Sequence, residues 1–442
     1  MSVIDNAGLV VDRKREMRRV IFSSYLGSAV EFYDFLLYGT AAALVFPAVF
    51  FSGLDAFTSV IFSFATFAAG YLARPLGGVI FGHFGDRLGR KKMLVLTMLI
   101  MGAASFLIGL VPGASVIGPW GAIILVLLRI CQGIAVGGEW GGAALMALEH
   151  SDSKKRGFSA SFVNAGAPSG ALLGSLMMGL FALLPQDQFF AWGWRIPFLF
   201  SGVLLAIGMY VRSKVSESPV FKEAIAKAEA EKAVKQPLPL WAVLRRPKAL
   251  ILVMLGAGAA FGFQVTMATF AQTYAVEFGG ISRSSILFAY SVASFLGIFA
   301  VIYAGRLSDR FGRKPVILTG IALFSAFLVP FFGWWGSGNV LLVFLGFFLA
   351  LQFHGLIYGP LAAFISEQFG TKSRYTGASL GYQLATLLGA GFTPGLLATL
   401  FRNSGGSITP VVLFLVGMGV VSLVAVLLTR ESRNNDLSTI EQ

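Results

Sequence analysis

The sequence predicts an all-α integral membrane protein with twelve transmembrane helices in two six-helix bundles. Hydrophobic residues make up 56% of the 442-residue chain, charged residues make up only 12%, and the mean hydropathy is +0.78. No soluble domain is this apolar. The apolar runs continue over about 20 residues and lack the alternation of barrel strands, which favours membrane-spanning helices.

Each expected span is a run of about 20 apolar residues. In the first half the runs cover 20–50, 57–81, 93–112, 119–148, 157–184 and 194–212. In the second half they cover 249–276, 285–304, 315–335, 339–366, 375–400 and 408–429. The residues before Val20 are polar and basic, so we expect no removed signal peptide. The single cysteine, Cys131, lies inside a span, which excludes a disulfide framework.

The basic residues gather on one side of the predicted membrane. The net charge is +13, and most of the 34 Lys and Arg lie in the termini and in the even-numbered loops. Cytoplasmic loops carry such an excess, so we expect both termini in the cytoplasm. The basicity is therefore a topology signal, and it argues against nucleic-acid binding.

A polar stretch divides the chain into two halves. We expect a cytoplasmic tail over 1–19, a bundle over 20–212, a cytoplasmic linker over 213–247, a second bundle over 248–429 and a tail over 430–442. The motif GHFGDRLGRKK starts at Gly82, and GRLSDRFGRK starts at Gly305. Such repeated halves are typical of transporters, with the substrate site between them near the bilayer midplane.

These motifs and several longer stretches resemble a known family over the whole chain. GDRLGRKK resembles the loop 2–3 signature of the major facilitator superfamily, and RICQG, from Arg129 to Gly133, resembles its fourth-helix motif. EFYDFLLYGTAAALVFP, ARPLGGVIFGHFGDRLGRKK, QGIAVGGEWGGAALMALE and WGWRIPFLFSG resemble the metabolite:proton symporter family, which includes shikimate, 2-oxoglutarate, citrate and proline/betaine transporters. The resemblance implies the major facilitator fold, a place in the bacterial inner membrane, and alternating access.

Two carboxylates and one arginine are expected near the bilayer midplane. Glu31 and Asp34 lie roughly 16 and 21 Å along their span from Val20. Arg129 lies about 15 Å below the outer end of its own span. A carboxylate at this depth costs roughly 2.5–3.5 kcal/mol, so such groups are usually functional. Burial favours the protonated carboxyl and a nearby arginine favours the carboxylate, so a change in their separation can move a proton.

By resemblance to sugar porters of the superfamily, Asp34 is the proton-coupling aspartate and Arg129 is its partner. Glu31 is the second candidate for the proton. The alternative is a permanent ion pair that exchanges no proton.

Other polar side chains inside the spans are candidates for a gate or for substrate contacts. We expect Arg74 and Glu139 to lie in the cytoplasmic half as a secondary pair, either structural or gating. The polar side chains in the spans of the second half are neutral, which suggests hydrogen bonds to substrate. A lone histidine such as His354 is also typical of a packing position. The candidate substrate contacts are Arg129, Tyr33, Tyr38, Gln132, Gln264, His354, Tyr358, Tyr382 and Gln383.

The charged loop motifs are expected to latch the transporter, because similar proteins use such contacts to hold the outward-facing state. Asp86 is expected at a neighbouring helix N-terminus, where the helix dipole favours a carboxylate. Ser308 replaces a glycine of the second copy, so we expect that copy to be half structural. Solvated topology charge is the alternative. The latch candidates are Asp86, Arg87, Arg90, Glu149 and Arg156 in the first copy, and Asp309, Arg310, Arg313, Glu367 and Arg374 in the second.

The sequence contains no P-loop, and its three histidines are scattered without metal-ligand spacing. We therefore expect no enzyme activity and no cofactor, with the proton as coupling ion and a monomer in the lipid bilayer. An exporter is the alternative, because antiporters of the superfamily carry a glycine–proline motif that NAGAPSG, from Asn164 to Gly170, matches in part. Arg129 favours a carboxylate substrate, and we expect a hydroxylated or aromatic organic acid such as shikimate.

Overall fold

The computed structural model describes residues 3–4, 10–11, 13–88, 90–149, 151, 155–213, 243, 245, 247–370 and 374–433, apart from some side chains within them. Most of the predicted linker lies outside these ranges. The described chain is almost entirely helical. Two strands of two residues each, β1 (Val3–Ile4) and β2 (Val10–Val11), pair antiparallel before the first helix.

The helices of the first half form what we call the first bundle. They are α1 (Arg13–Leu44), α2 (Phe46–Phe50), α3 (Ala56–Leu88), α4 (Arg90–Ile108), α5 (Ala114–Ile117), α6 (Trp120–Gly137), α7 (Trp140–Glu149), α8 (Arg156–Phe181), α9 (Gln186–Gln188), η2 (Phe189–Gly193) and α10 (Arg195–Ser213). The second bundle contains α13 (Pro247–Ala268), α14 (Phe270–Glu277), α15 (Arg283–Phe311), α16 (Arg313–Trp335), α17 (Val340–Glu367), α18 (Arg374–Thr386), η3 (Leu387–Gly391), α19 (Thr393–Asn403) and α20 (Thr409–Leu428).

Every predicted span coincides with one or more of these helices, and the all-α membrane fold is confirmed. Within the described residues, nine helical segments are long and apolar enough to cross a membrane. α4 adds a shorter apolar stretch, Val95–Ile108. α1 and α8 are less apolar because their buried faces carry charged, hydroxyl and glycine residues.

The first copy of the repeated loop motif is largely helical. α3 continues to Leu88, and α4 begins at Arg90. In the second copy the turn residue is Gly312, whose φ of 105° is rarely adopted by other residues. Helices can extend past the hydrocarbon because their polar ends meet water without penalty.

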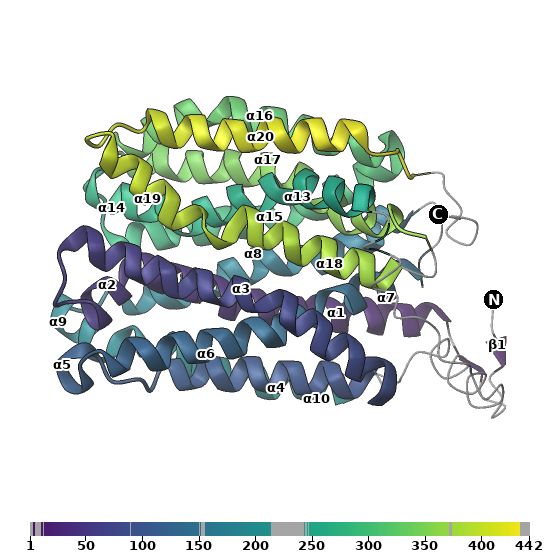
Figure 1. Cartoon of the computed structure of the whole chain (residues 1–442), viewed down its shortest axis with the longest axis horizontal. Coiled ribbons are helices and arrows are strands. Elements are labelled where there is room, and N and C mark those ends of the chain that lie inside the picture. The colour runs from purple at the N-terminus through teal and green to yellow at the C-terminus, as the bar shows by residue number, and fades with distance from the viewer. Residues whose placement is uncertain are drawn as a thin grey trace.

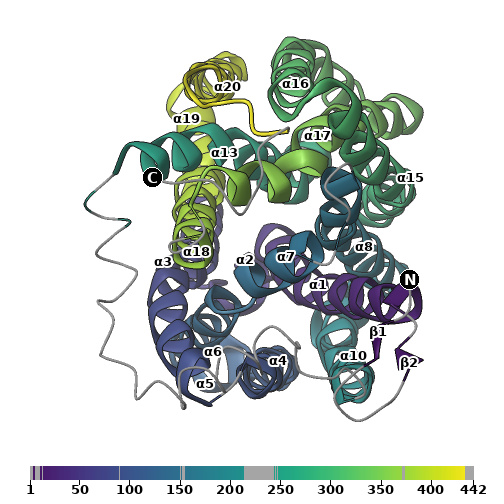
Figure 2. The ribbon, with the colours of Figure 1, turned by 90° about the vertical axis from the view of Figure 1, so that its right-hand side faces the viewer.

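The two bundles lie side by side and meet along two seams (Figures 1 and 2). At one seam α8 packs against α15 and α17, and at the other α3 packs against α18 and η3. The start of α1 and the end of α20 lie at the same end of the molecule, which we call the terminal face (Figure 1). We call the opposite end the distal face.

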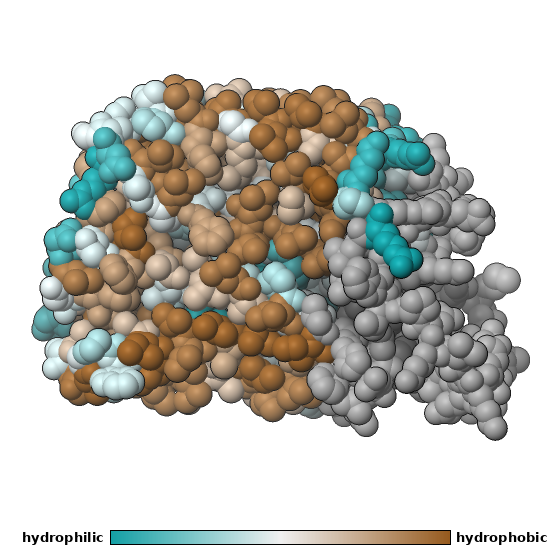
Figure 3. Space-filling view, viewed as in Figure 1, coloured by the Kyte–Doolittle hydropathy of each residue, from teal (hydrophilic) through white to brown (hydrophobic). Residues whose placement is uncertain are grey.

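The outer surface between the two faces is apolar, as a lipid-facing surface must be. In Figure 3, hydrophobic residues cover the middle of the molecule and hydrophilic residues gather toward the ends. Large apolar side chains that are more than half exposed include Phe62, Leu72, Leu127, Phe299, Val329 and Leu413.

Glycines allow α3 and α6 to pack backbone to backbone. A Cβ added at Gly133 would lie 2.0 Å from the carbonyl oxygen of Gly70, and one at Gly137 would lie 2.0 Å from that of Arg74. A Cβ at Gly70 would also lie 2.6 Å from Nε of Arg129. The small residues therefore leave the room in which Arg74 and Arg129 lie.

Gly133→Ala should lower the midpoint of thermal unfolding in detergent, because α3 and α6 must separate to admit the methyl group. Overpacking of this kind costs about 1–3 kcal/mol of unfolding free energy. The matched control is Gly417→Ala in α20, where an added Cβ meets nothing within 4 Å. Equal midpoints for the two variants would contradict the tight packing of α3 on α6.

Candidate functional site

The proton-coupling candidates lie inside the first bundle. Asp34 on α1 is 1% exposed, and its Oδ1 accepts a 2.5 Å hydrogen bond from Oγ of Ser201 on α10. Ser105 on α4 faces the same carboxyl group. Oγ of Ser105 accepts from Nε2 of Gln132 at 2.6 Å, and Oε1 of Gln132 accepts from Nη1 of Arg129 at 3.1 Å. A chain of polar contacts therefore runs from Arg129 to Asp34. The two serines were not predicted, because a hydroxyl in an apolar helix does not reveal which way it faces.

Asp34 and Arg129 share a layer but do not hydrogen-bond to each other. Within the described residues, Oδ2 of Asp34 and both Nε and Nη2 of Arg129 have no hydrogen-bond partner. Arg129 lies against aromatic rings instead, with its guanidinium carbon 3.8 Å from the centroid of Phe35 and 4.1 Å from that of Tyr38. These cation–π contacts hold the arginine away from the carboxylate.

Glu31 and Asp34 lie on different sides of α1. Glu31 is 4% exposed and lies within electrostatic reach of Tyr358 and Tyr382, which belong to the second bundle. The hydrogen-bonding groups at Asp34 within the described residues are Ser105 of α4 and Ser201 of α10. One helical turn thus separates a carboxylate at the seam from a carboxylate in the bundle interior.

The predicted secondary pair occupies the region where α3 approaches the break between α6 and α7. The guanidinium carbon of Arg74 lies 3.9 Å from the centroid of Phe35 and 4.5 Å from that of Tyr71. Glu139, which is 2% exposed, lies at the break itself. Phe35 and Tyr71 were not predicted as part of the site.

Neutral polar side chains on α17 and α18 of the second bundle face the first bundle. The hydroxyl groups of Tyr358 and Tyr382 lie 3.2 Å apart and hydrogen-bond to each other. Nε2 of His354 lies 3.0 Å from a backbone carbonyl of α13, and its ring stacks on Tyr358. Nε2 of Gln383 donates to a backbone carbonyl of α6 at 3.3 Å. His354, Tyr358, Tyr382 and Gln383 therefore come together as candidates.

Of three further substrate candidates, two lie inside the first bundle. The hydroxyl of Tyr33 donates to the carbonyl oxygen of Pro197 at 2.6 Å, away from the seams. The hydroxyl of Tyr38 donates to Oγ1 of Thr66 at 2.8 Å, close to Arg129. The third, Gln264, lines a cavity of only about 10 Å³ at the seam of α8 with α15 and α17, beside His354. The sequence could not separate the two tyrosines from the seams because it does not fix helix rotation.

At the terminal face, the second motif copy joins the two bundles. Both carboxylate oxygens of Asp309 accept backbone N–H groups in the first turn of α8, from Gly157 at 2.9 Å and Phe158 at 2.8 Å. Nη1 of Arg313 donates to Asp309 at 2.7 Å, and Arg313 also reaches both oxygens of Glu367 at 3.3 Å. We expected this copy to be half structural, and its aspartate nevertheless bridges the bundles.

The remaining latch candidates differ in their exposure and contacts. Arg310 is exposed, and Nε of Arg374 donates to a backbone carbonyl at 3.2 Å. Arg156 is 9% exposed in the first turn of α8. The side chains of Asp86, Arg87, Arg90 and Glu149 lie outside the described residues.

A cavity of about 590 Å³ lies between the bundles at the distal face. Its lining includes Phe57 and Asp55 from the start of α3 and Tyr274 and Arg402 from the second bundle. Nη1 of Arg402 lies 3.9 Å from Oδ1 of Asp55, and its guanidinium carbon lies 3.9 Å from the ring centroid of Phe57. Hydrogen bonds from Thr58, with a smaller contribution from Arg402, hold the pKa of Asp55 below its usual range, so this ion pair persists at neutral pH.

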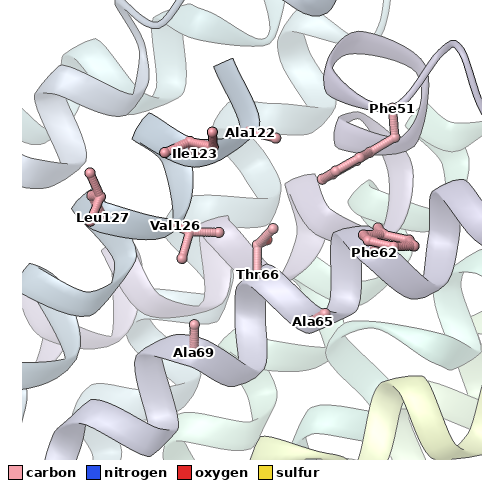
Figure 4. A pocket seen from close by; sticks show the side chains of 9 residues that line it. All are labelled: Phe51, Phe62, Ala65, Thr66, Ala69, Ala122, Ile123, Val126 and Leu127. Atoms are coloured by element: carbon pink, nitrogen blue, oxygen red, sulfur yellow. The ribbon is translucent and has the colours of Figure 1, made fainter. Parts of the chain in front are cut away.

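A second hollow, of about 310 Å³, is a lipid-side groove between α3 and α6 (Figure 4). Its lining side chains are Phe51, Phe62, Ala65, Thr66, Ala69, Ala122, Ile123, Val126 and Leu127. The one hydroxyl among them, on Thr66, already accepts from Tyr38. An apolar groove without free polar groups does not suit a polar metabolite.

Known proteins resemble the chain over nearly its whole length. The model of the Major Facilitator Superfamily matches residues 20–378 and 255–441. Inner membrane metabolite transport protein YhjE of Escherichia coli (strain K12) is 41% identical over 95% of the chain and 95% of its own length. The shikimate transporter of the same organism is 39% identical over 94% and 95%.

The fold resembles a solved structure of a proton:xylose symporter, XylE, bound to 6-bromo-6-deoxy-D-glucose. The TM-score is 0.76 at 17% identity, over 96% of the chain and 98% of the other. These relatives are transporters, not enzymes. The chain belongs to the major facilitator superfamily and is a multi-pass membrane transporter of metabolites.

Proposed function

We propose that the chain takes up a small organic carboxylate together with protons, by alternating access across the bacterial inner membrane, and that it acts as a monomer with both termini in the cytoplasm. The observation that carries this proposal is the setting of Asp34. Its carboxyl group is enclosed in the first bundle, accepts one serine hydroxyl, and stands in the same layer as Arg129 without a hydrogen bond to it.

This setting suits a group that gains and loses a proton. An enclosed carboxylate without a direct counter-ion is costly, whereas a neutral carboxyl group is not. Arg129 can stabilise the charged form if a change in the bundle brings it closer, and Gln132 and Ser105 already connect the two groups. The fold resembles that of a protein described as a proton:xylose symporter, and by analogy this supports the same type of coupling.

The two ends of the molecule support an outward-facing arrangement. Asp309 joins the bundles at the terminal face, which we place in the cytoplasm, and the cavity of about 590 Å³ lies between them at the distal face. A substrate arriving from outside therefore meets the open end. Resemblance to a shikimate transporter supports a ring carboxylate as substrate.

Uptake by proteoliposomes tests the function. The purified chain is reconstituted and given a panel of labelled organic acids, with and without an imposed pH gradient. We expect a hydroxylated ring acid to accumulate only when the outside is more acidic. Equal uptake with and without the gradient would reject proton coupling, and gradient-driven efflux would favour an exporter.

Asp309→Asn should slow transport while leaving substrate affinity measurable. The variant loses the charge that the α8 N-terminus and Arg313 stabilise, so the state with a closed terminal face becomes less populated. A loss of about 1 kcal/mol corresponds to a maximal uptake rate about fivefold lower. Asp187→Asn, at an exposed position of the distal face, is the control. An unchanged maximal rate at equal expression would count against a latch.

A further inference from the structure

The seam between α3, α7 and α18 holds buried polar atoms without partners. Within the described residues, Nε of Arg74, Nε1 of Trp140 and Oε1 of Gln383 have no hydrogen-bond partner. The three residues are only 3%, 2% and 1% exposed. Buried polar atoms in native proteins are nearly always paired, so a cluster of unpaired ones indicates a bound ligand or water in the working protein.

These three side chains lie near a pair of tyrosines, Tyr358 and Tyr382. Trp140 stacks on Tyr382 with ring centroids 3.7 Å apart and an angle of 16° between the rings. Gln383 follows Tyr382 on α18 and is fixed by the hydrogen bond from its amide nitrogen to α6. Arg74 lies within electrostatic reach of both Tyr382 and Tyr358. The unpaired atoms thus belong to both bundles, Arg74 and Trp140 to the first and Gln383 to the second, and their side chains lie in the neighbourhood of Tyr382.

The two arginines beside Phe35 differ in what they face. Phe35 contacts both, with guanidinium carbons 3.9 Å from its centroid for Arg74 and 3.8 Å for Arg129. Arg129 is fully buried, and the side chains within its electrostatic reach belong to the first bundle. Arg74 also acts on the tyrosines of the second bundle. Of these two arginines, Arg74 is therefore better placed for a substrate between the bundles.

We propose that Arg74, and not Arg129, binds the carboxylate of the substrate, together with the indole N–H of Trp140, while Oε1 of Gln383 accepts a hydrogen bond from a substrate hydroxyl. This proposal rests on the transport function proposed above and names the site that recognises the substrate. It gives Arg74 the substrate role that the sequence suggested for Arg129, and it leaves Arg129 with the proposed role beside Asp34.

The chemistry of the three atoms defines the class of ligand. Two N–H donors, one of them on a guanidinium, suit a carboxylate. An amide oxygen accepts hydrogen bonds and needs a donor such as a hydroxyl group. The stacked rings of Trp140 and Tyr382 favour a ligand with a ring rather than an open chain. A hydroxylated ring carboxylate satisfies all three atoms, whereas a betaine has no O–H or N–H for Gln383.

Equilibrium binding measured by calorimetry tests this site, because binding in detergent at one pH needs no proton gradient. The probes are shikimate, cyclohex-1-ene-1-carboxylate, which lacks the hydroxyl groups, and glycine betaine. We expect shikimate to bind most tightly to the wild-type chain. Arg74→Gln should weaken shikimate binding more than about tenfold, as expected for a lost charged hydrogen bond, and Arg74→Lys should fall between.

The variants of the two neighbours separate the two ends of the ligand. Gln383→Leu should weaken binding of shikimate but not of cyclohexene carboxylate, and Trp140→Phe should weaken binding of both. Trp192→Phe, at an exposed position near the distal face, is the matched control and should bind like the wild type. Thermal unfolding of each variant verifies that it is folded.

Three results would overturn the site. They are shikimate affinity in Arg74→Gln or Arg74→Lys within about twofold of the wild type, glycine betaine binding more tightly than shikimate, or no binding of shikimate by the wild-type chain. If binding behaves as expected but proteoliposomes show no gradient-driven accumulation, the proton coupling fails and this site stands.

Discussion

Asp34→Asn should abolish accumulation driven by a pH gradient and retain exchange of labelled for unlabelled substrate. The amide keeps the shape of the side chain and can still accept the hydrogen bond from Ser201, but it carries no titrating proton. The variant then resembles a permanently protonated carrier. Exchange survives because it requires no deprotonated return step, whereas net accumulation requires one. Both assays use the same proteoliposomes and differ only in whether unlabelled substrate is loaded inside.

Glu31→Gln is the matched control for this experiment. Glu31 lies one turn away on α1 and faces the seam, so its loss should have a milder effect on accumulation. The opposite pattern would contradict the assignment. If accumulation survives in Asp34→Asn and vanishes in Glu31→Gln, the coupling proton is carried at the seam and not in the interior of the first bundle.

The helical architecture was predictable because a membrane constrains the backbone so strongly. Every span must satisfy its hydrogen bonds internally, and each therefore appears in the sequence as a long apolar run. The expected depths of Asp34 and Arg129 rest on the same constraint, since rise per residue fixes depth along a helix. The repeated motif singled out Asp309 as a latch candidate, and its carboxylate accepts two backbone N–H groups of α8.

Helix rotation and side-chain contacts were not predictable in this way. The sequence does not indicate that Arg129 packs against Phe35 and Tyr38 rather than against Asp34. In the stretch GGEWGG, a Cβ at Gly141 would lie 1.8 Å from Oγ of Ser379, so this glycine allows the bundles to approach. The sequence does not indicate that the tryptophan of this stretch, Trp140, stacks on Tyr382 of the other bundle.

Arg129→Lys should lose most gradient-driven uptake while its equilibrium affinity for shikimate changes little. Arginine stacks its planar guanidinium on Phe35 and Tyr38 and donates from Nη1 to Gln132 at the same time. Lysine keeps the charge but has neither the plane nor the fork, so it cannot make both contacts. The path of polar contacts to Asp34 is then broken at its first step.

The expected loss is more than about tenfold in the uptake rate, because a hydrogen bond to a charged group contributes about 1.5–3 kcal/mol. Arg283→Lys, where the guanidinium lies 5.3 Å from the ring centroid of Phe190, is the control for a general loss of arginine at the distal face. Uptake by Arg129→Lys within about twofold of the wild type would remove Arg129 from the coupling site, since the missing hydrogen bond alone should cost more than that. A large loss of shikimate affinity in the same variant would instead return the substrate carboxylate to Arg129. Measuring uptake and binding on one preparation therefore decides which of the two arginines beside Phe35 acts in proton coupling and which binds the substrate.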